Sequence, residues 1–106
     1  MIILTTPSIE GREIEKYLGV VSGNAVLGTN IFRDIFAGIK DIVGGRMGQY
    51  EDVLEKAQEL AIEEMKEKAE KLGANAIIGV NISFNTIGQA SSMLMVNVVG
   101  TAVLIK

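Results

Sequence analysis

The chain has 106 residues, the size of a single domain, and a hydrophobic content of 48% excludes an intrinsically disordered protein. It contains neither cysteine nor histidine, which excludes a disulfide framework, a thiolate or imidazole metal site and a Ser-His-Asp triad. The formal net charge is −3, whereas a nucleic-acid-binding surface needs a basic balance. We therefore expect one domain, residues 1–106, that does not bind nucleic acid.

The first segment of the chain carries no targeting signal and leads into a strand. Residues 1–13 lack the basic start and the long apolar run of a signal peptide, so we expect a cytoplasmic protein. Apolar residues up to Leu27 favour a strand, with an interruption at Gly23-Asn24. Residues 13–18 fit either the beginning of this strand or a single helical turn.

Two helices are expected in the middle of the chain. The first runs from about Ile31 to Val43, where apolar residues recur at helical spacing, and it ends at Gly44-Gly45. The second runs from about Tyr50 to Leu72, with one apolar stripe and with Glu and Lys on its other faces. Gly73 supplies a natural C-terminal cap for this helix.

After Gly73 the hydrophobic pattern changes to a period of two, which indicates two further strands. The first should place on one face the side chains of Ile78, Val80, Ile82 and Phe84. The second runs from Met93 to Ile105 and is apolar on both faces. The region 72–105 has no charge and is long enough to cross a bilayer, but the asparagines spread through it favour strands and no membrane contact.

The order of these elements indicates an α+β domain. We expect an antiparallel sheet of three to four strands, covered on one face by two helices, in the order β-α-α-β-β. Two helices cannot cover the second face of the last strand or its edges, and no charge or proline protects them. We therefore expect further copies of the chain to cover these surfaces in a homo-oligomer. The alternative is that the N-terminal strands cover the second face within one subunit.

Short motifs along nearly the whole chain carry a family resemblance. They are Thr5-Thr6-Pro7, Leu18–Gly23, Asn30–Asp34, Gly38, Asp41–Arg46, Gly73–Ala76, Ser92–Met95 and Gly100–Ala102. In combination they resemble the YbjQ-like family of small bacterial and archaeal proteins. The resemblance implies dodecin-like α+β subunits that assemble as rings, with a pentamer as the expected form. It implies no established activity, and the family carries the label "putative heavy-metal-binding".

The donor atoms of this chain do not match that label. Soft and borderline metals select Cys, His and Met, and only methionines are present. Met93 and Met95 share a strand face, where they fit a core or an interface, since methionine commonly fills gaps. We therefore predict no metal-binding residues and no cofactor, with a metal ion implied by the family label alone. A hard cation held by carboxylates that a ring gathers at its axis is the alternative.

Candidate ligand-binding residues lie around the start of the long helix. Gly44, Gly45 and Arg46 would hold an anion on backbone N–H groups, or would serve only as a joint between two helices. Arg33 and Asp34 would pair across a subunit boundary or face a shared cleft with Arg46. An ordinary solvated helix face is the alternative for this pair.

The function expected from the sequence is that of a non-enzymatic ring, which binds a small ligand or ion or serves as a scaffold. The lack of His, Cys and paired catalytic carboxylates favours it. The alternative is a small enzyme with a site at the subunit interface, built from Arg33, Asp34 and Arg46, with Tyr50 as a further candidate.

Overall fold

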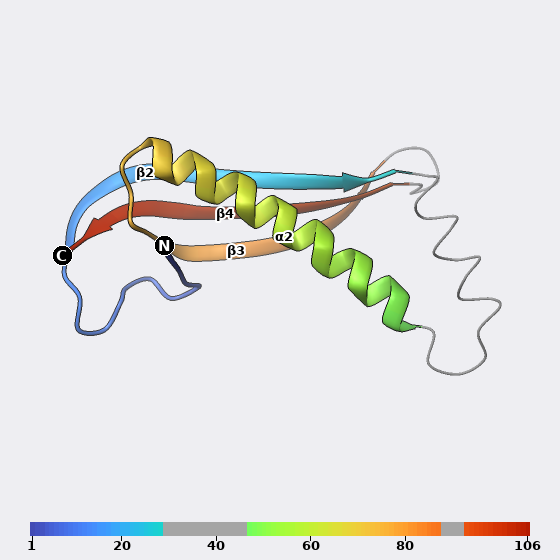
Figure 1. Ribbon diagram of the computed structural model, residues 1–106, viewed down its shortest axis with the longest axis horizontal. Helices are drawn as coiled ribbons and strands as arrows, with labels where there is room; N and C mark the ends of the chain where they lie inside the picture. Colours follow the sequence, from blue (N-terminus) through green and yellow to red (C-terminus); the bar gives the residue numbers. More distant parts are fainter. Residues whose placement is uncertain (29–46, 88–92) are drawn as a thin grey trace.

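The computed structural model describes residues 1–28, 47–87 and 93–106, with the side chains of the helix described from Leu54 onward. The elements follow in the order β1 (Ile2–Ile3), β2 (Ile14–Leu27), α2 (Met47–Lys71), β3 (Ala76–Ile87) and β4 (Met93–Ile105). The four strands form one sheet in the order β1-β3-β4-β2, and α2 lies across one face of it (Figure 1). The described part is therefore a two-layer α+β unit.

The predicted long helix and the strands that flank it are confirmed, but the pairing in the sheet differs from the prediction. β1 was not expected, and because it pairs in parallel with β3 the sheet is mixed and not purely antiparallel. The predicted interruption at Gly23-Asn24 is wrong, because β2 pairs with β4 in unbroken register from Val20 to Leu27. The predicted helix over 31–43 lies outside the described residues, so the β-α-α-β-β order stays a prediction.

The spacing of small apolar residues explains where α2 packs. Ala57, Ala61, Met65 and Ala69 recur every four residues and are fully buried or nearly so. They form the core together with Val21 and Leu27 of β2, Val80 of β3 and the inward side chains of β4. The helix ends at Lys71, and Gly73 follows in a left-handed conformation (φ 86°) that allows the chain to turn toward β3.

A bulge in β3 moves one predicted core residue to the other face. Gly79 has a φ of 60°, and the pairing with β4 shifts between Ile78 and Asn81. The extra residue resets the alternation of side chains. Val80 therefore packs beneath α2, whereas Ile78 packs on the opposite face. The prediction that Ile78 and Val80 share a face is wrong for this reason.

The N-terminal segment covers one end of the second face. There Ala76, Ile78, Val103 and Ile105 form a small buried cluster. It is covered by three partly buried side chains, those of Ile2, Ile9 and Ile14. Coverage within one subunit, the alternative raised by the sequence, thus holds at this end. Farther along this face Val20 and Val99 are 75% and 44% exposed.

The charge-free region 72–105 contributes β3 and β4 and does not form a helix in its described part. Throughout the described ranges, no helix combines the length and the apolar character that crossing a membrane requires.

Candidate functional site

The residues that the sequence nominated for ligand binding lie outside the described part of the chain. Arg33, Asp34, Gly44, Gly45 and Arg46 all fall between residues 29 and 46. Tyr50 belongs to α2, but its side chain is not among those described. These residues stay predictions. The described residues direct attention instead to the two edges of the sheet.

Among the strands that the structure describes, the first free edge belongs to β2, which is the outermost strand on one side of the sheet. From Tyr17 to Leu27 this strand has no charged residue and no proline. Its outer side therefore carries none of the lysines or prolines with which proteins commonly protect an edge strand. The outward backbone N–H and C=O groups of this edge could form hydrogen bonds with a further strand.

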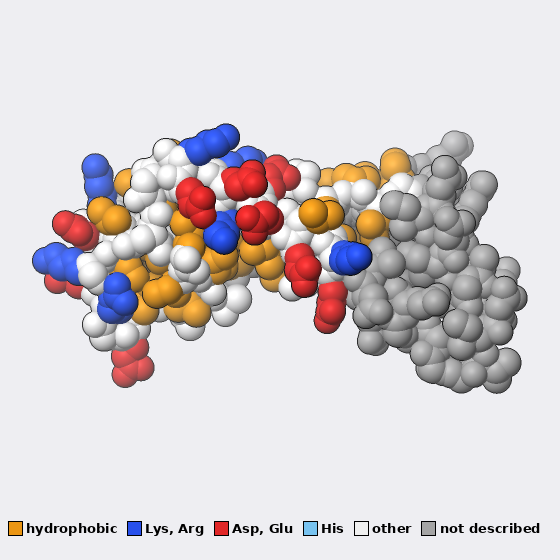
Figure 2. Space-filling model, in the orientation of Figure 1, with side chains coloured by type: hydrophobic (Ala, Val, Ile, Leu, Met, Phe, Trp, Pro, Cys, Tyr) orange, Lys and Arg blue, Asp and Glu red, His pale blue; other side chains and the backbone are white. Residues whose placement is uncertain are grey.

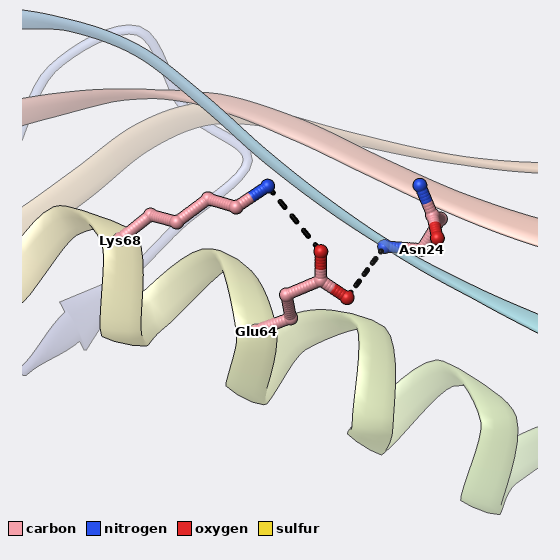
Figure 3. A network of polar contacts seen from close by, with 3 residues as sticks. All are labelled: Asn24, Glu64 and Lys68. Atoms are coloured by element: carbon pink, nitrogen blue, oxygen red, sulfur yellow. Dashed lines mark hydrogen bonds and ion pairs between the residues drawn. The ribbon is translucent and has the colours of Figure 1, made fainter.

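One side chain of α2 reaches this edge. The carboxylate of Glu64 accepts a hydrogen bond from the backbone N–H of Asn24, at 3.5 Å, and pairs with the Lys68 ammonium at 3.3 Å (Figure 3). The N–H of Asn24 must therefore face away from β4, because it bonds to the helix. Backbone groups alternate in direction along a strand, so the N–H of Ser22 also faces outward. At this length the Glu64 bond is weak and an incoming strand could displace it.

The second free edge belongs to β3 and covers only part of that strand. Near its beginning, β1 and the residues after it pair with β3, and Leu4 and Thr6 exchange backbone hydrogen bonds with Ile77, Gly79 and Val80. Beyond Val80, no described strand pairs with the outer side of β3. Residues 81–87 of β3 are also free of charge and proline. The sheet thus has two unlike free edges.

The helix covers the two edges unequally. α2 packs most extensively on β2, less on β4 and least on β3. Phe84 of β3 lies opposite the buried Val96 of β4, and so on the helix side of the sheet, yet it is 48% exposed. On the helix itself, Leu60 is 66% exposed. Figure 2 shows the charged side chains of both signs on the surface in this view, with apolar atoms between them.

The open face of the sheet, opposite α2, carries neutral hydrogen-bonding groups. In the paired register, Asn24 of β2 stands beside Asn97 of β4, which stands beside Ser83 of β3. Ser22 and Asn81 flank Val99 one step along the strands. Because this stretch holds no ionisable side chain, it offers no charge to attract a metal cation or an anion.

One comparison concerns the family of the chain. Residues 1–106 match the model of a family named YbjQ, which is described as "putative heavy-metal-binding". The chain belongs to the YbjQ-like family. The match covers the whole chain, so the resemblance predicted from the motifs is confirmed.

A second comparison concerns the fold. A similar structure is the crystal structure of a protein with unknown function from Pediococcus pentosaceus, which belongs to the DUF74 family. The TM-score is 0.66 and the sequence identity 20%, with 100% of this chain and 98% of that chain covered. At this identity the likeness concerns the fold alone, and it supports the α+β assignment.

The described residues do not fit the heavy-metal label of the YbjQ-like family. Throughout 1–28, 54–87 and 93–106, no group of three Asp, Glu, His or Cys side chains is placed to share an ion. The Glu64 carboxylate is engaged by Lys68 and Asn24. Glu59 and Glu63 line a shallow surface hollow together with Lys56 and Leu60, a mixed and solvated lining.

Sequence reasoning missed the features that define these edges. The hydrogen bond between Glu64 and Asn24 joins residues far apart in the chain, and no local sequence pattern predicts it. The exposure of Phe84 was missed because its alternation with polar neighbours is that of a buried strand residue. The glycine at position 79, inside an apolar run, was an available signal for a bulge.

Proposed function

We propose that this protein works as a subunit of a cytoplasmic homo-oligomeric ring without enzymatic activity, which binds a small ligand or ion or serves as a scaffold. The observation that carries the proposal is a pair of unlike edges without charge, one on β2 from Tyr17 to Leu27 and the other on β3 from Asn81 to Ile87. An edge of this kind left open to solvent invites uncontrolled strand pairing. Pairing with further copies of the same chain removes both edges at once.

The two edges favour a head-to-tail contact. β2 and β3 each run antiparallel to β4, so they run in the same direction. The edge of β2 in one copy would therefore pair in parallel with residues 81–87 of β3 in the next, and the sheet would continue across the boundary. A contact between two different surfaces, repeated by rotation, closes into a ring. The number of copies, five, is expected from the family resemblance.

The decisive experiment is native mass spectrometry of untagged protein, with elemental analysis of the same sample. We expect a single species of five subunit masses. Additional mass at one ligand per subunit or per ring would identify the bound ligand and favour the ligand-binding role. A ring of bare subunit mass would favour the scaffold. A monomer at micromolar concentration would refute the proposal.

The alternative function is a small enzyme with an interface site around Arg33, Asp34 and Arg46. An Arg33→Ala variant separates the two functions in the same instrument. If the ring dissociates, Arg33 is part of the assembly. If the ring survives but a co-purified ligand is lost, the residue belongs to a binding site. Turnover of that ligand by the wild-type protein would then support the enzymatic function.

A further inference from the structure

The position of α2 above the outermost strand has a consequence for any strand that docks there. A helix is about 10 Å across, and neighbouring strands in a sheet are about 4.8 Å apart. A helix centred on an edge strand therefore projects beyond that strand by about one strand spacing. Because α2 packs mainly on β2, a strand added beside β2 would lie beneath the outer flank of α2.

Glu64 identifies which residues form this outer flank. Its carboxylate reaches the outward N–H of Asn24, so this side of α2 overhangs the free edge. Leu60 lies one turn earlier on the same flank, since residues four apart are neighbours on a helix surface. Leu60 is 66% exposed and does not belong to the described core.

At the free edge of β3, an apolar side chain on the helix side of the sheet is left partly exposed. Phe84 is placed by its pairing with Val96 on the helix side of β3, but α2 makes only slight contact with β3, and 48% of the side chain is exposed. Ile82, two residues earlier on the same side, is half-buried at the margin of the core. In the described part of the chain, the helix side of β3 thus lacks a cover of the kind that α2 gives β2.

We infer that Leu60 of one copy packs on Phe84 of the next copy. The inference rests on the proposed ring and names the side-chain contact that accompanies its strand pairing. When β2 of one copy lies beside β3 of the next, the overhanging flank of α2 comes to lie above the bare side of β3. A second copy is therefore the occupant of both surfaces.

The distribution of charged side chains on α2 and β3 is consistent with a second copy as the occupant. β3 carries no charged residue from Ala76 to Ile87, and beside Glu64 the overhanging flank offers Leu60 as an apolar side chain for it. The charged side chains near it, Lys56, Glu59 and Glu63, line the solvent side of the helix and would form the rim of the contact. An apolar centre with a polar rim is the usual anatomy of a stable interface.

A charge exchange tests the contact directly. Leu60→Asp and Phe84→Lys, each alone, should reduce the ring population at least tenfold in native mass spectra, because each places an unpaired charge at the interface. The double variant should recover assembly at low salt and lose it again at high salt, as the new ion pair is screened. Leu72→Ser is the control, since Leu72 is also exposed but lies past the end of α2, and it should leave the ring intact.

A covalent test uses the absence of natural cysteine. A variant with Leu60→Cys and Phe84→Cys should, under a mild thiol oxidant, form a ladder of disulfide-linked subunits on a non-reducing gel. Either single variant should give no more than dimers. If wild-type protein is a ring, yet both single charge variants assemble normally and no ladder forms, the contact is refuted while the ring stands. If wild-type protein is a monomer, both the proposed contact and the proposed ring are refuted.

Discussion

Gly23 of β2 and Ala61 of α2 meet backbone to backbone. A methyl group added at Gly23 would collide with the carbonyl oxygen of Ala61 and would stand 2.8 Å from the amide nitrogen of Met65. Neither atom belongs to a flexible side chain, so the helix itself would have to move. The close approach explains why the stripe of α2 that faces β2 is built largely from alanine.

We predict that Gly23→Ala lowers the free energy of unfolding by about 3 kcal/mol, the upper part of the range for overpacked cores. The measurement is urea denaturation followed by circular dichroism. Gly28→Ala is the matched control, because no atom of the described residues lies within 4 Å of a methyl group at that position. Equal stabilities of the two variants would show that α2 does not approach β2 as closely as described.

Asn75 joins the beginning of β3 to the end of β4. Its amide nitrogen donates to the carbonyl oxygen of Ile105 at 2.9 Å, and its amide oxygen accepts from the Ile105 N–H at 2.8 Å. We predict that Asn75→Ala costs about 1–3 kcal/mol of stability, since both backbone groups of Ile105 lose their partner. Asn85→Ala, at an exposed position of β3, should cost less than about 0.5 kcal/mol. Thermal unfolding of the two variants side by side checks the difference.

Ser22 offers a way to block the free edge of β2 without breaking the sheet. Its N–H faces away from β4, by alternation from Asn24, so proline at this position removes no bond to β4. We predict that Ser22→Pro keeps the circular dichroism spectrum of the fold but reduces the native mass toward that of one subunit. In contrast, Val21→Pro should unfold the protein, because the N–H of Val21 points toward β4. A ring of unchanged mass in Ser22→Pro would exclude the β2 edge as the contact.

The donor set of the chain predicts the outcome of a metal titration. With neither cysteine nor histidine, and with no cluster of three acidic ligands in the described ranges, a soft or borderline metal has no site of ordinary affinity. We expect calorimetric titration with Zn²⁺ or Cu²⁺ to show no stoichiometric binding. We also expect a chelator to leave the thermal midpoint unchanged. One ion per ring would instead indicate carboxylates gathered at the axis, and one per subunit would restore the family label.

The difference between the sequence prediction and the structure follows from the range of the interactions involved. The helix from Met47 to Lys71 was predictable because the spacing of Ala57, Ala61, Met65 and Ala69 is a local property. The bulge at Gly79 was not predicted, since a single glycine leaves the period-two pattern of its neighbours almost intact. The proposed site at Arg33, Asp34 and Gly44–Arg46 depended on motifs whose residues lie outside the described part, so it stays a prediction.

The sequence by itself determined the long helix, the three long strands, the family and the exclusion of cysteine and histidine chemistry, because periodicity, motifs and composition are read directly along the chain. Only the tertiary structure decided which of the described strands are outermost, that α2 lies over β2, and that Phe84 on β3 is 48% exposed. These relationships depend on pairings such as Asn24 with Asn97 and Ser83 with Asn97, between residues distant in sequence. A strand's own residues show that it is half-buried, but its neighbours in the sheet decide which of its edges is free.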